Sequence, residues 1–339
     1  MRHKRPVISL SVPFAIFALA LVGCADAPEA DSRDQDSMAE AGAADQFPVS
    51  VSSCDFTSEL TEAPTKAVTL NQGATEVALA LGVEDQMAGT AYLDDDVPEE
   101  WQSAYESIPV LADDYPDRET LLAVEPDFLY ASYSSAFDDK VAGTREELAQ
   151  DGIATYLSPF GCPEGVEKAD PSFESVWDEV ESVAAAFGVP TRAEELRAEQ
   201  QGLLQELTEE SPGEGFSIFW YDFGDKNPYA GAGEGGPQLI MDAIGATNIF
   251  ADESGGWAEV SWERVLEADP DIIVLADASW STAEDKLAEM ESDSVLSNLK
   301  AVQNDAIITI PFSESTPGIR LVDGAVSVGE QLADFDPQG

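Results

Sequence analysis

From residue 66 onward, short apolar runs alternate with segments whose apolar residues recur at helical spacing. The run Ala67–Leu70, for example, is followed by a turn and by an apolar helix that ends at Gly82. Strands that alternate with helices form parallel sheets covered by helices, so residues 49–170 are predicted to form an α/β lobe. Its expected strands are Ala67–Leu70, Met87–Tyr92, Asp127–Ala131 and Ile153–Leu157, and its expected helices are Ala74–Leu81, Glu99–Glu106, Asp117–Val124 and Thr144–Gln150.

A second series of the same kind follows a helical stretch. Residues 171–212 are predicted to form two helices, over Pro171–Gly188 and over Arg192–Glu209, and leucines fall on one face of the second. We therefore expect an α/β fold of two lobes with mainly parallel sheets, joined by a single long rigid helix. The second lobe, residues 213–339, has expected strands Phe216–Tyr221, Asp271–Ala276 and Ala306–Pro311, and expected helices Gly236–Ile244, Trp262–Ala268, Ala283–Glu291 and Leu321–Leu332.

One segment occurs in similar form in both lobes. Residues 117–129 (DRETLLAVEPDFL) align without a gap with residues 261–273 (SWERVLEADPDII). Asp117 and Ser261 can each cap a helix, and the proline and aspartate of each copy end that helix and begin a strand. Each lobe thus contains the same helix–strand unit, and a cleft between two similar lobes is a common site for small molecules.

The N-terminus carries the features of an export signal. A basic start precedes an apolar run that ends in Leu21–Cys24, which resembles a bacterial lipobox. We expect residues 1–23 to be removed and Cys24 to anchor the chain by lipid to the outer face of the cell membrane. An uncleaved transmembrane anchor is the alternative, and it also places the body outside the cytoplasm. Residues 24–48 are acidic and poor in large apolar residues, which predicts a disordered tether.

Charge and histidine content narrow the function. The net charge of −51 excludes nucleic acid as a partner, because phosphate binding needs a basic surface. The acidity is typical of a salt-rich habitat or of an exported protein kept soluble by charge. The single histidine, His3, lies in the export signal, so the mature chain lacks imidazole for acid–base catalysis or for holding a bare metal ion. We expect neither an enzyme nor a resident metal or cofactor.

Two cysteines remain once Cys24 is assigned to the lipid anchor. In an oxidising compartment, Cys54 and Cys162 are predicted to form one disulfide, with two free buried thiols as the alternative. The bond would join the start of the folded body to the loop around Ser158–Cys162.

Several segments resemble the ferric-siderophore and cobalamin class of ABC-importer binding proteins. The resemblance covers about residues 66–332, nearly the whole folded body, and Glu125 departs from it by replacing the usual lysine. It is carried by the segments LNQGATE (residues 70–76), VEPDFL (124–129), GATNIFAD (245–252), Trp257 and VSWE (260–263).

This resemblance implies a function and a partner. The protein would be a monomeric binding protein that delivers a metal chelate to an ABC permease dimer, and its rigid connecting helix would allow little closure. Glu119 and Glu263 match the glutamates that dock on arginines of the two permease subunits. The alternative is that both are ordinary acids in the first turn of a helix.

Candidate ligand residues follow the strand ends, where open α/β sheets bind small molecules. Aromatic side chains give a large, flat contact area, and Trp257 matches a family position that packs against the ligand. Arg320 could bind chelate oxygens, with a surface ion pair as the alternative. The predicted ligand residues are Asn71, Gln72, Tyr92, Tyr133, Trp220, Tyr221, Trp257, Trp280, Phe312 and Arg320.

The chain has few lysines and arginines to neutralise an anionic ligand, which favours a weakly charged chelate. We therefore expect a ferric siderophore of the hydroxamate type rather than a catecholate. Cobalamin and haem are the alternatives within the class. Outside it, a lipid-anchored glycoside hydrolase that uses paired carboxylates and a surface lipoprotein without a transport role stay open.

Overall fold

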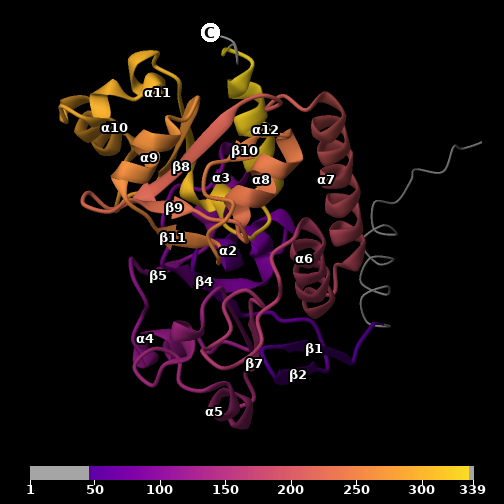
Figure 1. Ribbon diagram of the computed structural model, residues 1–339. Coiled ribbons are helices and arrows are strands. Elements are labelled where there is room, and N and C mark those ends of the chain that lie inside the picture. Colours follow the sequence, from indigo (N-terminus) through magenta and orange to yellow (C-terminus); the bar gives the residue numbers. More distant parts are fainter. Residues whose placement is uncertain (1–45, 336–339) are drawn as a thin grey trace, which may run out of the picture. The chain divides into compact units, whose positions relative to one another are not determined.

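Two α/β lobes follow one another in the computed structural model, which describes residues 46–335 (Figure 1). The described residues belong to one compact unit. The export signal, the lipidated Cys24 and all but the last three residues of the expected tether lie outside the described residues. In the part of the chain that the structure describes, we find no helix with the length and apolarity needed to cross a membrane.

The first lobe is built on a parallel sheet. Its strand order is β5-β4-β3-β6-β7, and all four neighbouring pairs are parallel, as the alternating pattern predicts. The strands are β3 (Ala67–Leu70), β4 (Met87–Ala91), β5 (Val110–Ala112), β6 (Phe128–Ala131) and β7 (Ala154–Leu157). The helices are α2 (Gln72–Ala80), η1 (Glu84–Gln86), α3 (Glu99–Ser107), α4 (Arg118–Ala123), η2 (Ser134–Phe137) and α5 (Arg145–Gln150).

A hairpin that the pattern did not predict precedes this sheet. Its strands β1 (Val49–Ser53) and β2 (Phe56–Leu60) are antiparallel, and Ser58 exchanges two hydrogen bonds with the backbone of Thr155 in β7. The turn of the hairpin holds Cys54, which forms the predicted disulfide with Cys162. The bond confirms the pairing and fixes the loop after β7 to the start of the folded body.

The second lobe has a mixed sheet. Its order is β11-β9-β8-β12-β13, with β10 beside β8; β8, β12 and β13 are parallel, whereas β9 is antiparallel to both of its neighbours. The strands are β8 (Ser217–Phe223), β9 (Tyr229–Gly231), β10 (Thr247–Asn248), β11 (Trp257–Glu259), β12 (Ile272–Asp277) and β13 (Ile307–Pro311). The helices are α8 (Gly236–Ile244), α9 (Trp262–Ala268), α10 (Ala283–Ser292), η3 (Leu296–Asn298), α11 (Lys300–Gln303), η4 (Phe312–Ser315) and α12 (Leu321–Leu332).

The two lobes are joined by α6 (Phe173–Phe187) and α7 (Pro190–Glu210), which lie side by side in Figure 1. Ala193 and Leu196 near the start of α7 belong to the core of the first lobe, and Leu207 near its end belongs to the core of the second. At about 1.5 Å per residue, α7 is about 30 Å long, so it spans both lobes as the predicted rod.

The repeated segment has the same structural role in each lobe. Asp127 at the start of β6 accepts hydrogen bonds from the backbone N–H groups of Thr65 and Lys66, at 2.7 and 3.0 Å, just before the neighbouring β3. Asp271 at the start of β12 accepts one from the N–H of Ser217, which begins the neighbouring β8, at 2.8 Å. In both lobes the aspartate therefore ties together the starts of two parallel strands.

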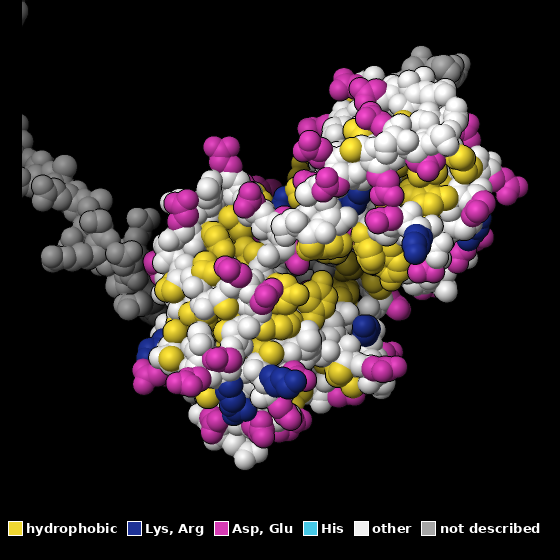
Figure 2. Space-filling view, turned by 90° about the vertical axis from the view of Figure 1, so that its left-hand side faces the viewer, with side chains coloured by type: hydrophobic (Ala, Val, Ile, Leu, Met, Phe, Trp, Pro, Cys, Tyr) yellow, Lys and Arg dark blue, Asp and Glu magenta, His cyan; other side chains and the backbone are white. Residues whose placement is uncertain are grey.

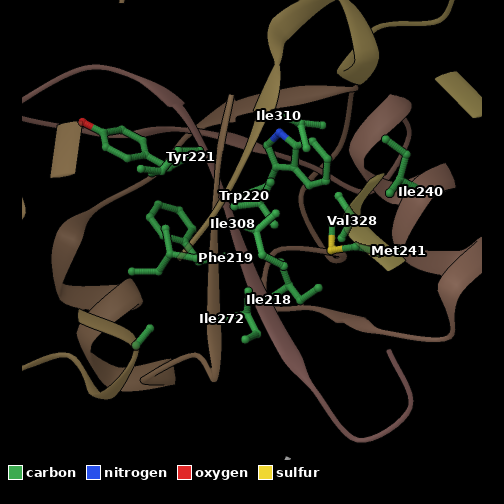
Figure 3. Packing of buried hydrophobic residues seen from close by; sticks show 14 of the residues in the cluster. Ile218, Phe219, Trp220, Tyr221, Ile240, Met241, Ile272, Ile308, Ile310 and Val328 are labelled. Carbon is green, nitrogen blue, oxygen red and sulfur yellow. The ribbon is translucent and has the colours of Figure 1, made fainter. Parts of the chain in front are cut away.

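The core of the second lobe is shown in Figure 3. The indole of Trp220 packs among aliphatic residues such as Ile240 and Ile310, and the ring of Phe219 lies on the opposite face of β8. Because successive strand residues point to opposite faces, β8 is buried on both sides, as is typical of a central strand. The buried centre of the sheet thus holds the residues that follow β8 in a fixed position.

Candidate functional site: a cleft between the lobes

A cleft of about 990 Å³ lies between the lobes and is lined by residues of both. Figure 2 shows hydrophobic side chains gathered in the hollow between the two lobes on the face opposite α7. From the first lobe, the lining comes from the segments after β3, β6 and β7, and from α6. From the second, it comes mainly from the segments after β8, β12 and β13, so both sheets present their carboxyl edges to the same space.

Five aromatic side chains of the second lobe form one wall of the cleft. Each contacts the next in a closed circuit, at ring-centroid separations from 4.9 to 6.5 Å. We call these residues the aromatic wall: Phe223, Tyr229, Trp257, Phe312 and Trp280. Phe223 is 41% exposed and Trp280 is 50% exposed. Large apolar faces left open to solvent inside a cleft are suited to contact with a bulky, partly apolar ligand.

The cleft is strongly acidic. Lys168 is the one cation among its lining residues. The lining carboxyl groups belong to Asp94, Asp170, Glu179, Asp222, Glu234 and Asp242. Among residues 46–335, no cluster of carboxylate, cysteine or histidine side chains could hold a metal ion. The carboxylates therefore act as a distributed negative potential, which attracts cations and repels anions.

Two of these carboxyl groups are buried: Glu179 on α6 and Asp222 near the end of β8. Burial raises the pKa of Glu179 to about 7, although hydrogen bonds partly oppose the shift. One of these bonds comes from the hydroxyl of Tyr130, 2.7 Å from Glu179 Oε1. Burial likewise raises the pKa of Asp222 to about 7, against the attraction of the Lys286 ammonium. The carboxyl groups of Glu179 and Asp222 are thus both partly protonated at neutral pH.

Half of the predicted ligand residues line the cleft. They come from both lobes, and all but Trp257, which begins the antiparallel strand β11, follow the ends of parallel strands. They are Gln72, Tyr133, Trp257, Trp280 and Phe312. Tyr133 is 45% exposed and lines the cleft from the first lobe. Three of the five belong to the aromatic wall: Trp280 and Phe312 follow strand ends, and Trp257 was indicated by the family resemblance.

Four other predicted ligand residues lie away from the cleft lining. Trp220 and Tyr221 are central residues of β8 and are fully buried in the core of the second lobe. Asn71 is buried and accepts a hydrogen bond from the hydroxyl of Tyr115, and the ring of Tyr92 packs edge-on against Tyr115. The sequence argument ended β8 at Tyr221, whereas the strand continues to Phe223, which displaced the predicted contacts by two residues.

Arg320 is also corrected: its side chain joins the lobes and is absent from the cleft lining. Its Nη1 lies 3.1 Å from Glu76 Oε1, on α2 of the first lobe, and 2.7 Å from Ser313 Oγ. Its Nη2 pairs with Glu314 in η4. The guanidinium and the Glu76 carboxylate are almost completely buried. Both predicted alternatives, a ligand contact and a surface ion pair, were wrong because the arginine is sealed within the junction between the lobes.

Several lining residues were not predicted from the sequence. Phe223 and Tyr229 flank a tight turn, and the segment GDKNP between them is a recognisable hairpin signal that could have located both. Glu179 carried no signal, because acidic residues are common on every helix of this chain. Asp222 gave none either, since its burial depends on how β8 ends.

Glu119 and Glu263 occupy equivalent places in the two lobes. Each lies in the first turn of its helix, α4 or α9, after a cap in which Asp117 or Ser261 accepts a backbone N–H. Both glutamates are exposed. Their positions thus correspond as the repeat predicts.

Replacement of Glu179 by Gln should change how stability depends on pH. The raised pKa means that the folded state holds a proton that the unfolded state releases near pH 4.5, so wild-type stability falls as the pH rises from 4.5 to 7. Gln cannot titrate. The unfolding free energy of Glu179→Gln, relative to wild type, should therefore rise by about 2–3 kcal/mol between pH 4.5 and pH 8. Denaturant unfolding at both pH values measures this difference. Glu206→Gln, on the exposed face of α7, controls for the loss of one charge, and a Glu179→Gln difference independent of pH would contradict the assignment.

Comparison with known proteins agrees with this architecture. A family model described as periplasmic binding protein matches residues 68–314. An uncharacterized ABC transporter substrate-binding lipoprotein of Bacillus subtilis, YvrC, is 25% identical over 93% of this chain and 93% of its own length. A vitamin B12-binding protein of Vibrio campbellii is 24% identical over 61% of this chain and 69% of its own.

A solved structure shares the same fold. A periplasmic binding protein from Veillonella parvula superposes with a TM-score of 0.72 and 26% identity, over 85% of this chain and 98% of that one. The family match covers both lobes and the connecting helices. The motifs quoted from the sequence also indicate this architecture. The chain belongs to the periplasmic binding protein family of substrate-binding proteins that serve ABC importers.

Proposed function

We propose that the protein captures a bulky metal chelate without net negative charge, foremost a ferric hydroxamate siderophore, and delivers it to an ABC permease. The observation that carries this proposal is the pairing of the aromatic wall with an acidic cleft lining. It would act as a monomer outside the cytoplasm, anchored by lipid at Cys24.

The aromatic wall supports the bulk and the apolar character of the ligand. Covering exposed rings such as Trp280 with a ligand makes binding more favourable, because apolar surface is removed from water. The cleft volume of about 990 Å³ lies at the upper end of the range for small-molecule sites, which suits a chelate better than a single sugar or amino acid.

The acidic lining supports the charge of the ligand. An anionic chelate would be repelled by carboxylates from both lobes and could pair with Lys168 alone among the lining residues. Ferric catecholates, which are highly anionic, and haem, with its propionate groups, are therefore disfavoured. Ferric hydroxamates are neutral or cationic, which makes them compatible with the lining.

Cobalamin is the second candidate, favoured by one specific observation. The relative from Vibrio campbellii carries the name vitamin B12-binding protein and is 24% identical to this chain. Cobalamin has a broad corrin face for the aromatic wall and amide groups in place of carboxylates at its rim. It thus satisfies both physical conditions that the cleft imposes.

Binding should separate chelates by charge. Quenching of intrinsic tryptophan fluorescence by neutral or cationic ferric hydroxamates, or by cyanocobalamin, should saturate, because Trp257 and Trp280 lie in the cleft. Ferric catecholates, ferric citrate and haem should quench weakly, and adding salt should reduce the difference by screening the carboxylates. Tight binding of an anionic chelate alone would overturn the proposal.

Truncation of the aromatic wall should weaken binding. Trp280→Ala removes an exposed ring that contacts both Phe223 and Phe312, so affinity for the preferred chelate should fall at least about tenfold. Calorimetric titration measures the change. Val295→Ala, which truncates another exposed apolar side chain, is the control and should bind as wild type does.

Docking to the permease should depend on the paired glutamates. Arg118 and Arg264, their neighbours along the chain, pair with other carboxylates, which leaves Glu119 and Glu263 available at the surface. The double variant Glu119→Lys plus Glu263→Lys should bind chelate normally and fail to support uptake in cells.

A matched control separates docking from net charge. Glu206→Lys plus Glu209→Lys makes the same charge change on the exposed side of α7 and should leave uptake intact. Normal uptake by the Glu119 and Glu263 double variant would refute the docking role without affecting the assignment of the cleft.

A further inference from the structure

Asp222 is a buried carboxyl group of the cleft that lacks a hydrogen-bond partner. The residue is 4% exposed, and it belongs to the cleft lining. No group in the described part of the chain donates a hydrogen bond to its Oδ1. Burying a polar group without a partner destabilises a fold, and such groups are rare in native proteins. Burial of Asp222 at this position therefore lowers the stability of the fold, so a stabilising role does not explain it.

An irregularity at the end of β8 directs this side chain. Tyr221 pairs with Ala230 and Phe223 pairs with Tyr229, so Asp222 is an extra residue on its strand. Such bulges are frequent beside binding sites, where they redirect a side chain. Successive strand residues normally point to opposite faces, yet Asp222 and Phe223 both line the cleft. The bulge thus places a carboxyl group directly beside the aromatic wall.

The nearby cation Lys286 does not donate the missing hydrogen bond to Asp222 Oδ1. Lys286 on α10 is buried, but its ammonium donates to the carbonyl oxygen of Ala276 and lies 5.9 Å from the ring of Tyr221. It leaves Asp222 Oδ1 without a donor. The indole N–H of Trp220, two residues earlier in β8, is also buried without a partner, so this strand carries two polar groups without hydrogen bonds.

We infer that Asp222 accepts a hydrogen bond from an N–H group of the bound chelate, after a rotation of its side chain that turns the enclosed Oδ1 toward the cleft. The inference rests on the proposed function and narrows it: the cleft selects chelates that carry amide or ammonium groups. An N–H donor completes the hydrogen bonding of the carboxyl group, whereas a carboxylate or catecholate oxygen would add a second acceptor and a second negative charge. The aromatic wall would hold the apolar part of the chelate while Asp222 fixes its orientation.

Two ferric trihydroxamates, one with an N–H donor and one without, test this inference. One is a linear chelate with a terminal ammonium group, and the other is the neutral tris(N-methylacetohydroxamate) complex, which has no N–H. In calorimetric titrations, Asp222→Leu should weaken the ammonium chelate by about 10- to 100-fold and leave the N–H-free complex unchanged. Cyanocobalamin, which carries amides, should follow the ammonium chelate.

Two further variants keep the test decisive. Asp222→Asn keeps the shape of the side chain and should weaken the ammonium chelate by less than Asp222→Leu does. Asp139→Leu, at an exposed position outside the cleft lining, should change neither affinity. If Asp222→Leu weakens both trihydroxamates equally, or neither, the inference is overturned while the proposed function stands. If the wild-type protein binds none of the three probes, the proposed function fails and the inference fails with it.

Discussion

The buried ion pair between Arg320 and Glu76 is the interaction on which the arrangement of the lobes depends. It links the start of α12 in the second lobe with α2 in the first, and both side chains are almost completely buried. Removing Arg320 would leave the buried carboxyl groups of Glu76 and Glu314 without their counter-charge, a loss that typically costs about 3–5 kcal/mol. Together with α7, which contributes to both cores, the pair holds the lobes apart at one spacing.

The binding surface is attached to this junction. Ser313 accepts a hydrogen bond from Arg320 through its hydroxyl, and its backbone N–H donates to Asp95 of the first lobe, at 3.1 Å. The preceding residue is Phe312, which stacks on Trp257 in the aromatic wall. The position of the wall relative to the first lobe is therefore set by hydrogen bonds across the junction. We therefore expect the cleft to close little when a ligand binds, so that little binding free energy is lost to rearrangement.

Much of the fold could be predicted from the sequence because its local signals agree with one another. Helix α8, for example, begins and ends at the residues that its apolar spacing and Gly245 indicate, and the repeated segment forms the same helix–strand unit in both lobes. The hairpin of β1 and β2 was missed, because its short alternating strands precede the strand–helix succession. The antiparallel strands β9 and β11 have three residues each, too few for a pattern to develop.

The site was only partly predictable, for physical reasons. Aromatic residues after strand ends have a recognisable pattern, which located Trp280 and Phe312, whereas Trp257 was located by the family resemblance. Burial of a charged residue depends on tertiary neighbours, so the sequence could not show that Arg320 pairs across the junction or that Asp222 lacks a partner.

Spin labels on the two lobes test the fixed spacing most directly. Cysteines introduced at the exposed Asp139 and Glu291 place one label on each lobe, and the native disulfide occupies both other cysteines of the described chain. The structure predicts one narrow distance distribution by double electron–electron resonance, and saturating chelate should move it by only a few ångströms. A broad or two-peaked distribution without ligand, which collapses to a distance shorter by about 10 Å or more with it, would contradict a preformed cleft.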